Sequence, residues 1–148
     1  MSNDAKVTKD LVQTCKDGEE GFAKAAAKLA ESGRDDLAGQ FREFSEQRGQ
    51  FASELEGLAA SYGDDGDKSG SVAAAIHRGW MTVKDKISGS DVDGVLDVAE
   101  QGEDHATSEY AKALDQDISA GLRAVITRQQ TAVNAAHDTV KRLRDTQS

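Results

Sequence analysis

The fold of this 148-residue chain is decided by the stretch DLAGQFREFSEQRGQFASELEGLAASY, residues 36–62. Its apolar side chains recur at spacings of three, four and seven, at Leu37, Phe41, Phe44, Phe51, Leu55, Leu58 and Tyr62. Side chains at these spacings lie on one face of an α-helix, whereas a strand would place them at every second residue. The stretch therefore predicts a long amphipathic helix that packs against a facing helix.

Four further segments show helical spacing, and clusters of glycine, serine and aspartate separate them. A short connection around residues 32–35 and a turn near Asp117 are typical of helical hairpins. The stretch GDDGDKSG, residues 63–70, predicts an acidic glycine-rich loop. Residues 1–9 precede the periodic pattern, and we expect them to be flexible. The expected helices are approximately 10–31, 36–62, 71–88, 92–115 and 119–144.

The order of long and short helices predicts a topology. Helices joined by so few residues pack as antiparallel neighbours, so the chain contains two antiparallel hairpins. About thirty residues separate the hairpins, which is enough to cross a bundle. One long crossover between two helical hairpins is the ferritin-like arrangement. We therefore predict a single all-α domain over residues 1–148, a ferritin-like four-helix bundle with a short crossover helix at 71–88.

The composition agrees with this prediction and excludes several classes of partner. The chain has no proline and only 5% aromatic residues, which suits long helices better than turn-rich sheets. A net charge of -9 repels phosphate backbones and anionic lipid, so we expect neither nucleic acid nor a membrane as a partner. The N-terminus lacks a signal-peptide pattern, so we expect a cytoplasmic protein. Cys15 is the only cysteine, and we expect it to be buried as a small apolar residue.

Each long helix places one polar side chain where its apolar stripe predicts a core residue. These side chains are Glu19, Arg48, Glu103 and Gln129. In an antiparallel hairpin, residues equidistant from the turn lie at the same depth. Glu19 and Arg48 are symmetric about residues 33–34, and Glu103 and Gln129 are symmetric about residue 116. The pattern therefore predicts one buried polar layer near the middle of the bundle.

This layer has two interpretations. Di-iron carboxylate bundles use a Glu from each of two helices and a Glu-x-x-His pair from each of the other two. Glu19 and Glu103 are candidates for the single ligands, with Glu20 or Glu100 beside them. Arg48, however, brings a positive charge to the layer, and the helix at 119–144 has no acidic residue before position 138. We therefore favour a buried network in which the Arg48 guanidinium bridges two carboxylates, without metal, cofactor or catalytic residues. Iron or manganese binding is the alternative.

Four segments carry a resemblance to a known family. They are TCKDGEEGF (14–22), EQRGQFASEL (46–55), GSVAAAIHRGWM (70–81) and QGEDHATSEY (101–110). Together they resemble a bacterial family of ferritin-like four-helix-bundle proteins described as a domain of unknown function. The resemblance implies a ferritin-like fold, a bacterial setting and a stress-associated role, and it implies no reaction. We therefore expect a non-enzymatic interaction module that binds an unidentified protein partner and forms a homo-oligomer.

Overall fold

The computed structural model describes residues 3–61 and 92–147, and all regular structure in these ranges is helical. The helices are α1 (Asp4–Glu31), α2 (Asp35–Ser61), α4 (Val92–Leu114) and α5 (Ala120–Gln147). The all-α prediction is confirmed for these ranges, and α2 and α4 begin and end within one residue of their predicted bounds. The acidic loop predicted at 63–70 and the crossover helix predicted at 71–88 lie outside the described residues.

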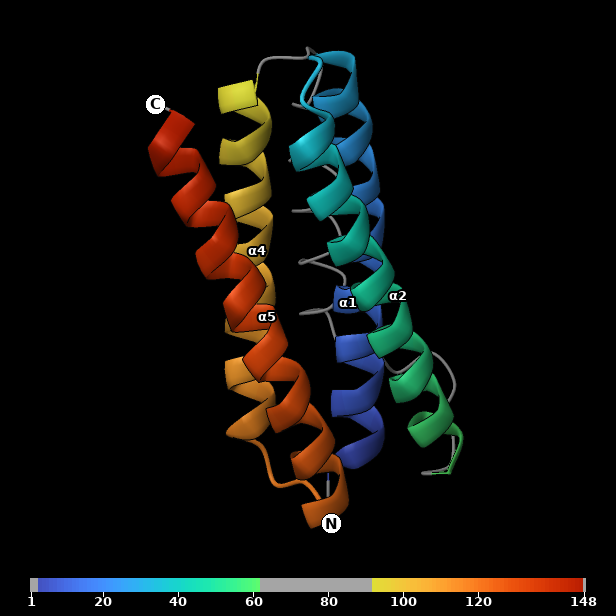
Figure 1. Ribbon diagram of the computed structural model, residues 1–148. Helices are drawn as coiled ribbons and strands as arrows, with labels where there is room; N and C mark the ends of the chain where they lie inside the picture. Colours follow the sequence, from blue (N-terminus) through green and yellow to red (C-terminus); the bar gives the residue numbers. More distant parts are fainter. Residues whose placement is uncertain (1–2, 62–91, 148) are drawn as a thin grey trace.

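The helices lie alongside one another and form a helical bundle (Figure 1). α2 packs along α1, α4 packs along α5 and α1 packs against α4, whereas α2 and α5 contact each other at few points. The N-terminus and the α4–α5 connection lie at one end of the bundle, and the α1–α2 connection lies at the other (Figure 1). Across the two described ranges, no helix has the length and apolar character that a bilayer crossing requires.

The buried apolar side chains form two clusters, one toward each end of the bundle. The cluster toward the α1–α2 connection includes Phe22, Leu29, Phe41, Leu96 and Val140. The cluster toward the N-terminal end includes Val7, Leu11, Cys15, Leu55, Leu122 and Ile126. Along α1, α2 and α4 the change from one cluster to the other falls near Gly18, Arg48 and Glu103. A polar layer therefore separates two apolar halves of the core.

The N-terminus is the main departure from the predicted helix bounds. The prediction of flexibility over residues 1–9 was wrong from Asp4 onward, because α1 begins there. The Asn3 N–H donates to the Asp117 carbonyl at 2.7 Å, and the Ser119 N–H donates to the Asp4 carboxylate at 2.8 Å. Val7 is buried in the core. Helical periodicity does not predict these contacts, because they are made to a connection about 115 residues away along the chain.

A glycine allows the tight connection between α1 and α2. Gly33 has a φ of 80°, which places it in the left-handed region that glycine adopts without steric cost. The Arg34 N–H donates to the Leu29 carbonyl at 2.9 Å, and the Gly33 N–H donates to the Ala30 carbonyl at 3.0 Å. These bonds satisfy carbonyls that the end of a helix leaves free. The connection therefore reverses the chain within a few residues.

Candidate functional site at the middle of the bundle

Arg48 and Glu103 form an ion pair in the polar layer. The Arg48 Nη1 donates to Glu103 Oε1 at 2.7 Å, and Nη2 donates to Oε2 at 2.6 Å. The two side chains are 1% and 0% exposed. Two parallel charge-assisted bonds are the strongest geometry for an arginine and a carboxylate. The pair joins α2 to α4 across the interior, although these helices do not pack along each other.

Two residues of α1 shape the space around the guanidinium. Gly18 lies against it, since a Cβ at this position would stand 3.2 Å from Arg48 Nη1. The Phe22 ring centre lies 5.3 Å from Arg48 Cζ, within range of a cation–π contact. Burial opposes the charge on Arg48, but the charge and hydrogen bonds of Glu103 outweigh burial and raise the pKa of the guanidinium above its usual value. The interior therefore contains a permanent cation whose charge Glu103 balances.

A chain of hydrogen bonds crosses the N-terminal cluster next to this pair. The Tyr110 hydroxyl donates to Gln129 Oε1 at 2.7 Å, and Gln129 Nε2 donates to Glu54 Oε1 at 2.8 Å. Because the Tyr110 hydrogen is used on Gln129, the 3.1 Å contact between Cys15 Sγ and the Tyr110 oxygen has the thiol as donor. Arg128 pairs with the other Glu54 oxygen at the surface. The chain thus links all four described helices.

The thiol and the phenol in this chain both keep their hydrogens. Burial raises the pKa of Cys15 to about 11, and the opposing effect of the positive charge of Arg48 is smaller. Burial also raises the pKa of Tyr110 well above its usual value. The thiolate is the nucleophilic form of cysteine, so Cys15 is not an activated nucleophile at neutral pH. The chain of hydrogen bonds therefore holds helices together and does not activate a reacting group.

Three of the four residues predicted for the polar layer are buried, namely Arg48, Glu103 and Gln129. The prediction was wrong for Glu19, which is exposed. Gly18 faces the guanidinium, and the next residue of a helix is turned away by about 100°. The Glu19 carboxylate instead lies over the α2 backbone, where a Cβ on Gly49 would come within 2.5 Å of its Oε2. Among the described residues, Arg48 therefore pairs with one carboxylate rather than bridging two.

Gln129 is buried as predicted, but its partner differs from the predicted one. It bonds to Tyr110 instead of lying level with Glu103. Tyr110 lies nine residues before Ser119, and Gln129 lies nine residues after Ala120. The two bonded residues are therefore equidistant from the connection at Ser119 and Ala120, whereas the predicted turn lay several residues earlier. The register of α4 against α5 depends on the length of the connection between them, and helical periodicity alone does not define that length.

The residues named for the metal alternative are not brought together. Glu20 is exposed on α1, and the Glu100 carboxylate contacts Arg144 of α5. Both oxygens of Glu103 accept hydrogen bonds from Arg48. In the part of the chain that the structure describes, no group of three or more His, Cys, Asp or Glu side chains is placed to hold a metal ion. The donors of these ranges therefore do not fit the alternative of an iron or manganese centre.

Sequence reasoning missed Tyr110 and Glu54 as members of the polar network. Tyr110 lies on the same stripe of α4 as Glu103, seven residues later, and helical spacing alone indicates only that it faces the core. A buried tyrosine needs a partner for its hydroxyl, and this requirement was a usable signal toward Gln129. Glu54 offered no such signal, because a glutamate beside the apolar stripe of an amphipathic helix is usually solvated.

The fold and the polar layer define a class: an all-α helical bundle whose interior contains a charge-balanced arginine–glutamate pair. Residues 5–116 match the family described as Domain of unknown function (DUF2383), and the chain belongs to this family. The matched range contains Cys15, Arg48, Glu103 and Tyr110 but ends before α5. Comparisons with curated proteins and with solved structures gave no match.

Proposed function

We propose that this protein is a non-enzymatic helical bundle that acts by associating with protein, and that its interior holds no resident metal or cofactor. The observation that carries the proposal is the two-pronged pairing of Arg48 with Glu103. At the middle of the bundle, the Arg48 guanidinium balances the charge of Glu103, the carboxylate that a metal ion would need as a ligand. An ion is therefore not required to compensate the buried charge.

The proposal includes a ferritin-like topology of two antiparallel hairpins. The short connections between α1 and α2 and between α4 and α5 support the hairpins, and the long stretch between α2 and α4 supplies enough chain for a crossover. In such a bundle Arg48 stands where di-iron proteins place a ligand pair. The resemblance of the four segments described above supports a bacterial setting and a stress-associated role.

Elemental analysis separates this proposal from a metal-binding protein. The wild type and Glu103→Gln are expressed in medium supplemented with iron or manganese and purified without chelator. We expect well below one metal ion per chain in both. Glu20→Gln is the matched control, since it removes an exposed carboxylate from α1. Stoichiometric metal in the wild type and in Glu20→Gln, but not in Glu103→Gln, would overturn the proposal.

We propose the α2–α5 face as the surface for association. Glu54 and Arg128 pair across this face, and side chains three or four residues away on a helix project from the same side. The apolar residues placed there are half-buried in the single chain. They are Phe44, Phe51 and Leu58 on α2, and Val125 and Ala132 on α5. Because α2 and α5 contact each other so little, these side chains keep apolar surface that a partner can cover.

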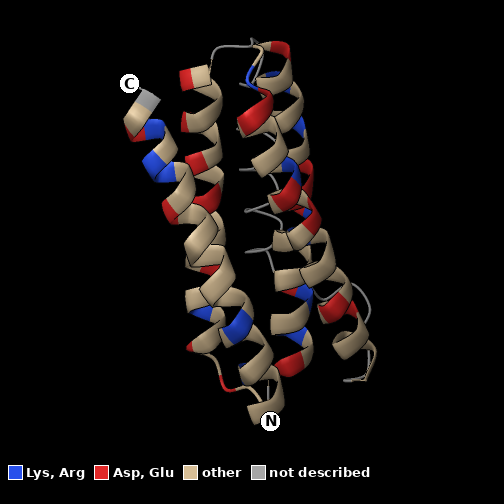
Figure 2. Ribbon diagram, in the orientation of Figure 1, with Lys and Arg blue, Asp and Glu red and all other residues tan. Residues whose placement is uncertain are grey.

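Charge complementarity supports the proposal that the partner is a second copy of the chain. Apart from the buried Arg48, α2 carries six acidic residues and one basic residue. α5 carries five basic and two acidic residues, and Figure 2 shows blue segments along α5 and red segments along α2. A two-fold axis parallel to the helices places α2 of one copy against α5 of the other. The predominantly acidic α2 of one copy then faces the predominantly basic α5 of the other.

Light scattering over a range of protein concentrations tests the association. We expect a species of twice the 15.7 kDa chain mass, and we expect salt to weaken it because the rim is charged. Phe51→Ser should shift the equilibrium toward single chains. Val12→Ser is the matched control, because Val12 is also a half-buried apolar residue of the N-terminal cluster but belongs to α1. A protein that stays at 15.7 kDa throughout, or a dimer that Phe51→Ser leaves intact, would contradict the proposed face.

A further inference from the structure

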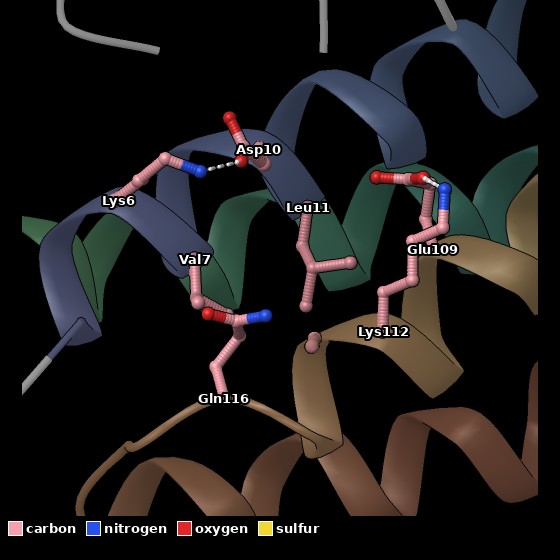
Figure 3. A pocket seen from close by; sticks show the side chains of 8 residues that line it. Lys6, Val7, Asp10, Leu11, Glu109, Lys112 and Gln116 are labelled. Atoms are coloured by element: carbon pink, nitrogen blue, oxygen red, sulfur yellow. Dashed lines mark hydrogen bonds and ion pairs between the residues drawn. The ribbon is translucent and has the colours of Figure 1, made fainter. Parts of the chain in front are cut away.

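A small hollow lies where the first turns of α1 meet the last turns of α4 (Figure 3). Its volume is about 90 Å³. The apolar side chains of Val7, Leu11 and Ala113 line it, together with charged side chains that include Glu109 and Lys112. The hollow is separate from the α2–α5 face, since the residues that line it come from α1, α4 and the connection after α4.

Glu109 is a buried carboxylate with little charge compensation. Its side chain is 5% exposed, and its partner is the Lys112 ammonium, 3.4 Å from Oε2. Lys112 is itself 62% exposed, and Oε1 of Glu109 accepts no hydrogen bond from a residue within 3–61 or 92–147. Figure 3 shows Lys112 against one oxygen and the other oxygen turned toward the side of Leu11 and Asp10. Glu103, by contrast, has both oxygens bonded by a guanidinium.

The surroundings of Glu109 select the chemistry of a ligand. A buried anion favours a cation that donates hydrogen bonds, and the wall formed by Val7, Leu11 and Ala113 favours an alkyl group. A divalent metal needs several oxygen ligands, and the described residues place no group of three or more ligating side chains together. Lys6 is already paired with Asp10 at 3.3 Å on the opposite side of the hollow. The hollow thus offers one anionic acceptor beside an apolar wall.

The volume limits the size of the ligand. An apolar cavity of about 150 Å³ admits benzene, which has six heavy atoms. In proportion, a hollow of 90 Å³ admits about four heavy atoms. We propose that this hollow binds a small primary alkylammonium ion, with the ammonium group on Glu109 and the alkyl chain against Val7, Leu11 and Ala113.

Titration of the isotope-labelled full chain with propylammonium chloride, followed by NMR, tests the proposal. We expect saturable shifts of the backbone amides of residues 6–11 and 109–116. Propionate has a similar size and the opposite charge, and it should produce no saturable shift. Sodium chloride at the same concentration controls for ionic strength. Shifts that do not saturate, or that propionate or sodium chloride reproduces, would overturn the proposal.

Substitutions show whether Glu109 and the hollow are responsible. Glu109→Gln keeps the shape of the side chain and removes its charge, so the affinity for propylammonium should fall at least about tenfold. Glu20→Gln is the control at an exposed position of α1 and should leave the affinity unchanged. Lys112→Met removes a competing cation and should strengthen binding by a few-fold, since an exposed pair contributes little. Equal affinity in the wild type and Glu109→Gln would contradict the proposed site.

A second variant keeps the test decisive if Glu109→Gln does not fold. Ala113→Leu keeps the carboxylate and fills the hollow with a larger side chain, so propylammonium should no longer produce saturable shifts. The dispersion of the amide spectrum reports folding in the same experiment. Binding that persists in folded Ala113→Leu would place the ligand elsewhere on the molecule and overturn the assignment of the hollow.

Discussion

Ion pairs occur in two contrasting regions of this molecule. In the interior, Arg48 and Glu103 are 1% and 0% exposed and share two short hydrogen bonds. At the outer edge of the contact between α4 and α5, His137 Nε2 lies 2.6 Å from Asp104 Oδ1, with 20% and 65% of the side chains exposed. Water can solvate the Asp104 carboxylate if its partner is removed, but it cannot reach Glu103 without opening the core. The same kind of contact is therefore indispensable in one region and dispensable in the other.

The largest expected effect comes from removing the interior cation. Arg48→Met should lower the free energy of unfolding by about 3–5 kcal/mol, because it leaves the Glu103 carboxylate buried and unpaired. Chemical denaturation followed by circular dichroism measures this change. Arg128→Met is the matched control, since Arg128 is 58% exposed, and it should cost no more than about 1 kcal/mol.

The double variant Arg48→Met, Glu103→Leu sharpens this comparison. It removes both buried charges and replaces them with apolar groups of similar length, so it should recover most of the lost stability. Equal loss in the single and double variants would show that packing around Arg48, and not its charge, stabilises the interior.

Two glycines on facing helices give the second contrast. A Cβ on Gly18 would lie 3.2 Å from Arg48 Nη1, and this buried guanidinium is held by Glu103. Gly18→Ala should therefore destabilise by about 1–3 kcal/mol through overpacking. The three atoms nearest to a Cβ on Gly49 all belong to the carboxylate of Glu19, which is the far end of an exposed, flexible side chain. Gly49→Ala should be neutral or stabilise by up to about 1 kcal/mol, because alanine favours helix.

Thermal unfolding of both alanine variants measures this difference. If Gly49→Ala destabilises as much as Gly18→Ala, the Glu19 side chain is fixed more firmly than its exposure indicates. The surface side chain beside Gly49 would then resist displacement as strongly as the buried side chain beside Gly18.

The hydrogen-bonded chain should respond less strongly than the ion pair. Tyr110→Phe removes the donor to Gln129 and the acceptor of the Cys15 thiol without changing the size of the ring. We expect a loss of about 1–2 kcal/mol, the usual cost of leaving a buried polar group unsatisfied. Denaturant unfolding measures the loss. Unchanged stability would indicate that Gln129 and Cys15 contribute nothing through Tyr110.

The smallest effect is expected at the outer edge and depends on pH. Burial lowers the pKa of His137, but the hydrogen bond and charge of Asp104 outweigh it, and the net pKa lies above the ordinary value of 6.5. A raised pKa in the folded state stabilises the fold at pH values below 6.5, and this contribution is lost as the pH rises through the raised value. His137→Gln should therefore lower the Tm more at pH 5.5 than at pH 8.5, and its effects on the free energy of unfolding at the two pH values should differ by less than about 1 kcal/mol.

His105→Gln is the control for this measurement, because it removes a histidine of α4 that does not belong to the pair. The difference between the two variants at each pH value isolates the contribution of the His137–Asp104 pair. A His137→Gln effect that is equal at the two pH values, or larger at pH 8.5, would show that protonation of His137 does not stabilise the contact between α4 and α5.

The sequence predicted the residues of the interior better than their pairing. Arg48, Glu103 and Gln129 interrupt apolar stripes, and helical periodicity therefore placed them in the core. Glu19 was placed there by the same rule, although it lies one position beyond the residue that faces Arg48. Helical periodicity indicates which face of a helix is buried, but it does not decide which of two adjacent residues points to a given partner. The partner of Gln129 was missed because the pairing depends on the register of α4 against α5.

The sequence by itself determined that the regular structure within residues 3–61 and 92–147 is helical, because the spacing of apolar residues and the absence of proline act locally along each helix. Only the tertiary structure decided that Arg48 pairs with Glu103, that Tyr110 bonds to Gln129 and that Glu19 faces outward. It also decided that α1 begins at Asp4, through hydrogen bonds to a distant connection. These outcomes depend on how helices far apart in the chain are rotated and shifted against one another. The local spacing of residues does not determine that geometry.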